Sequence, residues 1–358
     1  MQIKKSLKTL HPYKPTNKRP NIKLDANESN NFLFNNTLTL KGIPLNLYPD
    51  SQSSSLKQRL SLLHGVDEES IMVGSGSSEL IELVIKTYLN PGDTVLSIDP
   101  TFAMYEIYTT IHSGNYVKVP VDESYAIDME QLTREAKHLN PSIIILCSPN
   151  NPTGERISKD AITTLLKSSE SLVLVDEAYM DFTGEAHSMK HAVNTYSNLI
   201  VTRTFSKAYG LAGARLGYLF TSKNIIDDLS RVKTPYSVNA LTQALGLEAL
   251  KDSSKIFTHC KGVKIRREAL KESLRDLGLV VLDSEANFLY LISNDARLKD
   301  KLLNYDIAIR AFENTVPATY RITVGSEEEN NKLLTALKEV SLSDKPPYKE
   351  KQERPLSP

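Results

Sequence analysis

From residue 70 onward, short apolar runs alternate with stretches of helical periodicity. The runs cover residues 94–98, 116–121, 142–147, 172–175, 199–202 and 215–220. Several are apolar at nearly every position, which is typical of strands buried on both faces of a sheet. A helix-period stretch with Leu80, Leu83, Val84 and Tyr88 ends at Asn90-Pro91-Gly92. This alternation predicts an α/β fold with a mostly parallel central sheet in a large domain.

The pattern changes after about residue 222. Helical stretches at 241–250 and 264–277 precede two strand candidates, 288–292 and 321–324, and a last helix near 330–340. That order predicts a smaller α+β domain. We therefore expect an N-terminal arm at 1–44 that joins the small domain, a large domain at 45–240 and a small domain at 241–342. The remainder, 343–358, holds four prolines and no apolar pattern, and we expect it to be disordered.

Charge and cysteine content exclude several classes of function. The 43 basic and 43 acidic residues give no net charge, so no global field attracts nucleic acid or an anionic membrane. The two cysteines have no metal-type spacing, so we expect no metal site, and so few thiols suit a reducing compartment. No apolar run is long enough for a membrane span. The basic first 24 residues could be a transit peptide, but the interpretation as an exposed arm of a cytoplasmic protein is favoured.

Polar residues follow the predicted strands at their carboxyl ends, where open α/β sheets bind ligands. Residues 148–154 read SPNNPTG, residues 176–179 read DEAY, and residues 203–208 read RTFSKA. Upstream, GSGSSE at 74–79 leads into a predicted helix, and Arg215 follows the lysine at position 207. A helix N-terminus after a Gly-rich turn, together with an arginine fork, suits a phosphate group. GSGSSE is a poor dinucleotide fingerprint, because Glu79 stands where the third glycine belongs.

These segments, with several others, resemble the fold-type I aminotransferases, and within them the histidinol-phosphate aminotransferase family. The matching motifs are HPY (11–13), DANE (25–28), LYPD (47–50), GSGSSE (74–79), PTFAMY (100–105), CSPNNPTG (147–154), VDEAY (175–179), RTFSKAYGLAGARLGY (203–218) and YRITVG (320–325). They keep the family's order from about residue 10 to 340. The resemblance implies a fold-type I transferase that depends on pyridoxal 5′-phosphate.

The resemblance also implies roles for individual residues. Lys207 would form the Schiff base with the cofactor and then act as a general base and acid. Asp176 would hold the pyridine nitrogen, and Asn151 and Tyr179 the phenolic oxygen of the ring; we take Lys207, Asp176 and Tyr179 as catalytic. Phe102 would stack on the ring. The phosphate contacts are expected from Ser77, Ser78, Thr204, Ser206 and Arg215, and from Tyr48 of a neighbouring subunit, so the resemblance implies a homodimer with shared active sites.

On the substrate side, Arg321 would grip an α-carboxylate, and Arg310 and Tyr13 the phosphate of the amino donor, with Asn27 nearby. The favoured donor and acceptor are histidinol phosphate and 2-oxoglutarate, as in histidine biosynthesis. An aromatic amino-acid aminotransferase, a threonine-phosphate decarboxylase and a binding module without turnover remain alternatives. The chain departs from the family pattern at Phe102, where tyrosine is usual, and in the segment LYP, where RYP is common. These departures affect the donor rather than the cofactor.

Overall fold

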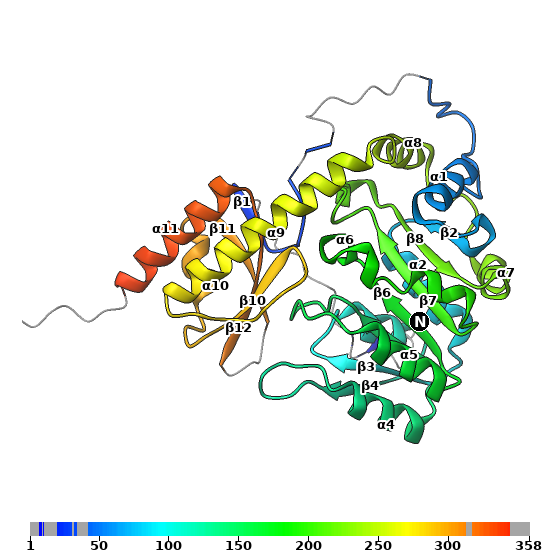
Figure 1. Ribbon diagram of the computed structural model, residues 1–358, viewed down its shortest axis with the longest axis horizontal. Coiled ribbons are helices and arrows are strands. Elements are labelled where there is room, and N and C mark those ends of the chain that lie inside the picture. The colour runs from blue at the N-terminus through cyan, green and yellow to red at the C-terminus, as the bar shows by residue number, and fades with distance from the viewer. Residues whose placement is uncertain are drawn as a thin grey trace, which may run out of the picture.

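Two β-sheets organise the chain (Figure 1). The large sheet has seven strands in the order β2-β8-β7-β6-β5-β3-β4, and the small sheet has five in the order β1-β11-β12-β10-β9. The strands are β1 (Ile22–Leu24), β2 (Ile71–Gly74), β3 (Thr94–Asp99), β4 (Asn115–Pro120), β5 (Ile143–Cys147), β6 (Leu172–Asp176), β7 (Leu199–Thr204), β8 (Gly217–Thr221), β9 (Val280–Val281), β10 (Phe288–Ser293), β11 (Ile307–Phe312) and β12 (Ala318–Thr323).

The α-helices connect and cover these strands. They are α1 (Ser54–His64), α2 (Ser77–Tyr88), α3 (Met104–Ile111), α4 (Met129–Leu139), α5 (Lys159–Ser168), α6 (Met180–Thr183), α7 (Lys223–Val232), α8 (Ala240–Ala249), α9 (Ser253–Asp276), α10 (Leu298–Leu303) and α11 (Glu327–Ser343). This computed structural model describes residues 7, 8, 10, 20–30, 32, 33, 42–312 and 317–343. Tyr13 and the predicted disordered segment beyond residue 343 therefore lie outside the described residues.

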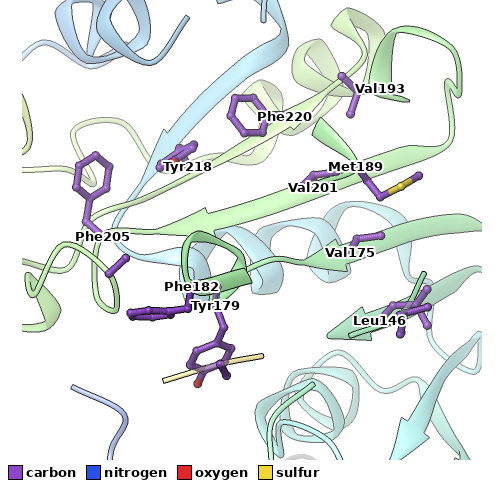
Figure 2. Close-up of a cluster of buried hydrophobic side chains, with 14 of the residues drawn as sticks. Leu146, Val175, Tyr179, Phe182, Met189, Val193, Val201, Phe205, Tyr218 and Phe220 are labelled. Carbon is purple, nitrogen blue, oxygen red and sulfur yellow. The ribbon is translucent and has the colours of Figure 1, made fainter. Parts of the chain in front are cut away.

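The large sheet is mostly parallel, as the apolar runs predict. Strands β3 to β7 pair in parallel, and only β8 runs antiparallel to its neighbours β7 and β2. Alternate side chains bury against opposite helical layers. Ile143 and Ile145 pack in one cluster with α2, α3 and α7, whereas Ile144 and Leu146 pack in another with α4 and α5. Figure 2 shows part of the second cluster, where side chains of β5 to β8 meet.

The small sheet joins the two ends of the chain. The short strand β1 pairs in parallel with β11, and the other pairs are antiparallel. One face packs under α9, α10 and α11, where Leu274, Leu302 and Leu337 meet Leu291 and Ile322. The opposite face carries the side chains that line the space toward the large sheet, which is where the site lies.

Some elements differ from the sequence prediction. Strands β1, β2, β9 and β11 were not expected, because each is short or lacks a clear alternation. The predicted strand 215–220 begins only at Gly217, since Arg215 has a left-handed φ of 52°. We retain the division into a large and a small domain as a proposal. The β1–β11 pairing supports placing the arm with the small domain, and packing of α8 on α1 favours a boundary after α8.

Within the described part of the chain, none of the helices combines the length and apolar character that a bilayer crossing needs. Nor does any group of three or more His, Cys, Asp or Glu side chains among those residues have the arrangement of a metal site.

Candidate active site

The N-terminus of α2 forms one end of a cavity between the two sheets. Gly76 precedes the helix with φ of +83°, and a Cβ there would lie 2.7 Å from Nη2 of Arg215. A Cβ on Gly217 would lie 2.3 Å from the backbone nitrogen of Ser77. Both positions therefore need glycine, because only then can the arginine and β8 approach the helix end. The free N–H groups of the first helical turn at Ser77 and Ser78 face the same space.

Hydroxyl groups from the end of β7 complete this corner. The Thr204 hydroxyl donates to Oγ of Ser206 over 3.0 Å, and the Ser206 backbone N–H donates to Thr204 Oγ1 over 3.1 Å. Arg215 Nη1 donates to the Ser206 hydroxyl at 3.4 Å. The first turn of α2, two hydroxyls and a guanidinium thus line the same corner of one cavity. That donor set is suited to an anion with several oxygens, such as a phosphate.

The whole cavity has a volume of about 200 Å³. Away from the anion corner, aromatic and apolar side chains and one carboxylate line it. Phe102 forms one wall, and Asp176 lies at the end of β6. Asp176 is buried; its Oδ2 accepts from the Tyr105 hydroxyl at 2.7 Å, and its Oδ1 accepts from Thr202 Oγ1 at 3.1 Å. Burial raises the pKa of the Asp176 carboxyl, and these hydrogen bonds oppose that rise by favouring the ionised form.

Lys207 lies between the two sheets, beside the Tyr179 ring, whose centroid is 5.7 Å from Nζ. Its ammonium donates to the backbone oxygen of Ala26 over 2.9 Å. Burial lowers the pKa of Lys207 to about 7, and the nearby charge of Arg321 adds to this effect. An amine with a pKa of about 7 is neutral in a large fraction of molecules near pH 7, and the neutral form can act as a nucleophile or as a base.

A second cavity of about 250 Å³ adjoins the first and shares Phe102, Asn151, Tyr179 and Lys207 with it. Arg310 on β11 and Arg321 on β12 line this second cavity. The two arginines are direct partners in the antiparallel register of these strands, so their side chains leave the same face of the small sheet. Two neighbouring guanidinium groups beside a near-neutral amine form a site for an anionic amine or keto acid.

A turn after β1 holds the two sheets together at the site. Asn27, fully buried with φ of 54°, donates through Nδ2 to the Tyr179 hydroxyl at 3.0 Å. Arg321 donates to the Asn151 side-chain oxygen through Nη1 and to the backbone oxygen of Asp25 through Nη2, the latter over 2.8 Å. Burial raises the pKa of the Tyr179 phenol. The phenol therefore stays protonated and can donate a hydrogen bond at neutral pH.

The structure brings the predicted site residues together with one exception among those it describes. All except Tyr48 line one cavity or the other. The Tyr48 side chain is 82% exposed and stacks on Tyr236, with ring centroids 4.7 Å apart. Cys147 lines the first cavity, and burial raises the pKa of its thiol, so it is a neutral wall residue.

Sequence reasoning missed three residues that either line a cavity or hold a residue that does. Tyr105 and Thr202 hold the Asp176 carboxylate, and Phe312 lines the second cavity. A signal existed for Tyr105, since it follows Phe102 at a spacing of three, which places both on one side of a helical turn. Thr202 could have been found by the strand alternation that points Leu199 and Val201 the opposite way.

Comparison with known proteins gives a consistent result. The family description "Aminotransferase class I and II" matches residues 19–337. A histidinol-phosphate aminotransferase from Caldanaerobacter subterraneus subsp. tengcongensis is 35% identical over 347 residues, covering 94% of this chain and 98% of that protein. The solved histidinol-phosphate aminotransferase from Clostridium acetobutylicum has a TM-score of 0.83 at 28% identity, over 90% of this chain and 99% of the other. That from Sinorhizobium meliloti, solved with pyridoxal-5′-phosphate, shares the fold, with a TM-score of 0.83 at 24% identity over 91% and 92% of the two chains.

Proposed function

The chain belongs to the class I and II aminotransferases, and within them to the histidinol-phosphate aminotransferase family, and we propose that its amino donor is histidinol phosphate and its acceptor 2-oxoglutarate. It is a pyridoxal-phosphate-dependent aminotransferase. The observation that carries the donor proposal is that Arg310 and Arg321 are register partners in the cavity that contains Lys207, so that Arg310 can take the donor phosphate while Arg321 takes a carboxylate. The proposal would place the enzyme in histidine biosynthesis.

The first cavity fits the cofactor. Its anion corner, formed by Ser77, Ser78, Thr204, Ser206 and Arg215, would hold the cofactor phosphate, and the two glycines at positions 76 and 217 leave the room that a Cβ would fill. Asp176 would pair with the ring nitrogen, Asn151 and Tyr179 with the ring oxygen, and Phe102 with the ring face. When bound, the cofactor supplies the electron sink that transamination needs.

The chain's own groups perform the proton transfers. In its neutral form, the amine of Lys207 would take a proton from the substrate α-carbon as a positioned base. It would then donate that proton to the C4′ carbon of the cofactor as an acid. The donors around the Asp176 carboxylate favour its ionised form, which would stabilise a protonated ring nitrogen. Arg321, held by Asn151 and the Asp25 carbonyl, is oriented to receive a substrate anion.

We also propose that the active unit is a homodimer with shared sites, working in the cytoplasm. The exposed side chains of Leu45, Leu47 and Tyr48 support the dimer, because they are three large hydrophobic residues of one short segment that a second copy could cover. Tyr48 would then reach the cofactor phosphate of the partner. The free, buried cysteines Cys147 and Cys260 support a reducing compartment.

The donor proposal is tested by kcat/KM for histidinol phosphate, phenylalanine and threonine phosphate in the wild type, Arg310→Ala and Arg321→Ala. A charge-assisted contact to phosphate is worth about 1.5–3 kcal/mol, or roughly ten- to a hundredfold. Arg310→Ala should therefore lower kcat/KM for histidinol phosphate by that factor and affect phenylalanine little. Arg321→Ala should lower kcat/KM for 2-oxoglutarate and for every donor that carries an α-carboxylate.

The matched control is Arg134→Ala on α4, whose arginine is 66% exposed and pairs with Glu130. This variant should have the wild-type kcat/KM for all three donors. If the wild type prefers phenylalanine and Arg310→Ala changes no donor, the enzyme is an aromatic aminotransferase. If threonine phosphate is consumed with release of carbon dioxide, the decarboxylase alternative replaces the proposal.

A further inference from the structure

We propose that Tyr105 is a positioning residue for the cofactor ring, because its hydroxyl orients Asp176 and its aromatic ring supports Phe102. The proposal rests on the proposed function, since it assigns these two neighbours to the nitrogen and the face of the cofactor ring. Tyr105 itself is fully buried and lines neither cavity. It would therefore act through residues that touch the cofactor.

The first step concerns the hydroxyl. An ionised carboxylate has about four acceptor positions and no donor. At Asp176, Oδ1 accepts from Thr202 at 3.1 Å and from the Ala178 N–H at 3.2 Å, and Oδ2 accepts from Tyr105 at 2.7 Å. Three positions are thus occupied, which leaves one on Oδ2 for a ring N–H. The Tyr105 bond sets the direction of this last position.

The same bond also favours the charged carboxylate. Burial raises the pKa of the Tyr105 phenol well above its ordinary value, so the group remains a donor throughout the working pH range. The hydrogen bond that the Tyr105 hydroxyl donates favours the ionised form of Asp176 and opposes the rise in pKa that burial causes. A negative Asp176 is what holds a proton on the ring nitrogen.

The second step concerns the aromatic ring. Tyr105 and Phe102 meet edge to face, with centroids 5.4 Å apart and planes at 85°. The Tyr105 N–H donates to the Phe102 carbonyl over 3.1 Å, so the turn before α3 fixes the two residues together. Such edge-to-face pairs stabilise one orientation of each ring. Tyr105 therefore connects the wall that would cover the cofactor ring to the carboxylate that would pair with its nitrogen.

One group in the same cavity as Asp176, Lys207, changes charge near neutral pH, because burial lowers its pKa to about 7. Cys147 from β5 and Tyr179 from the loop after β6 are neutral, because burial raises the pKa of both. Glu177, the next residue along, pairs with Arg203 at 2.8 Å. Lys207 is common to the wild type and all variants, so a displacement of the acid profile that appears only when the Tyr105 hydroxyl is removed is assigned to Asp176.

The experiment compares Tyr105→Phe, Tyr105→Leu and the control Tyr218→Phe. Tyr218, on β8, is fully buried like Tyr105 but lines neither cavity. Its hydroxyl lies 2.9 Å from His64 Nε2. For each protein, the dissociation constant of pyridoxal 5′-phosphate is measured by equilibrium dialysis across pH, alongside thermal unfolding without cofactor. No turnover is needed for either reading.

Tyr105→Phe should weaken cofactor binding about tenfold at neutral pH. Because its Asp176 is protonated more readily, the acid loss of affinity should also begin about one pH unit higher than in the wild type. Tyr105→Leu should lose more cofactor affinity than Tyr105→Phe, since it also removes the aromatic ring that packs against Phe102. Tyr218→Phe should lose comparable thermal stability but keep the wild-type affinity and pH profile.

Two results would overturn the proposal. If Tyr105→Phe keeps the wild-type affinity and acid profile, its hydroxyl does not position Asp176. If Tyr105→Phe and Tyr218→Phe lose affinity equally, without a displaced acid profile, Tyr105 is only part of the core. Failure of the wild type itself to bind the cofactor would instead refute the proposed function, so the two failures are distinguishable.

Discussion

Replacement of Arg203 by methionine tests how much the fold depends on a buried ion pair behind the site. The Arg203 and Glu177 side chains are both fully buried, with Nε 2.8 Å from Oε2. Arg203 Nη1 also lies 3.2 Å from Asp181 Oδ1 and 3.0 Å from Glu185 Oε1. The pair ties the end of β6 to the end of β7, one residue away from Asp176 and Thr204.

The expected loss follows from the partner left behind. Breaking a fully buried pair costs about 3–5 kcal/mol, chiefly because the remaining charge loses its compensation. Here Glu177 keeps two donors, the Ser188 hydroxyl at 2.6 Å and the Met189 N–H at 2.7 Å. We therefore expect a loss near the lower end, about 3 kcal/mol. The exposed pair Lys251–Glu248, with side chains 65% and 49% exposed, should contribute less than about 1 kcal/mol.

The assay is urea unfolding followed by far-ultraviolet circular dichroism, at one fixed and saturating cofactor concentration, because bound cofactor itself adds stability. Arg203→Met is compared with Lys251→Met and with the double variant Arg203→Met/Glu177→Gln. Removing the charge of Glu177 in the Arg203→Met background should recover part of the loss. If Arg203→Met costs no more than Lys251→Met, or if the double variant is no more stable than Arg203→Met, the reasoning about the buried pair is refuted.

Two further predictions concern the site itself. Because burial lowers the pKa of Lys207 to about 7, its amine is mainly charged below that pH and mainly neutral above it, so covalent capture of the cofactor should rise as pH increases through about 7 and then level off. Mass spectrometry after borohydride reduction should find the label on Lys207, and a label on another lysine would contradict the assignment. In the second, mixing Lys207→Ala protein with Tyr48→Phe protein should restore part of the activity through one repaired site per heterodimer. No recovery under conditions of proven subunit exchange would argue against shared sites.

The sequence predicts the large sheet well, because continuous apolar runs such as 143–147 have few alternatives to a doubly buried strand. It predicts the residues around the first cavity because their motifs lie at strand ends. It does not predict contacts that depend on tertiary packing. Tyr105 and Asp176 are 71 residues apart, and the Arg310–Arg321 register requires the strand β11, whose short run gave no clear signal.

The sequence also does not predict the burial of charged residues next to the motifs. Arg203 and Glu177 look like solvated loop residues at the ends of predicted strands, yet both are fully buried. Their burial is possible only because each neutralises the other, and that compensation depends on the neighbouring position of β6 and β7 in the sheet. The sequence gives the two charges but not their distance.

The strand β1 has a consequence for how the enzyme is made on the ribosome. Its pairing with β11, and the bond from the Asn27 N–H to Thr323 Oγ1 across 296 residues, join the first part of the chain to the last. At about 5–20 residues per second, the turn that contacts Lys207 and Tyr179 waits roughly 15–60 s for its partner strands to be synthesised. The nascent large sheet can form during this interval, but Lys207 stays open to solvent until β11 and β12 have been synthesised.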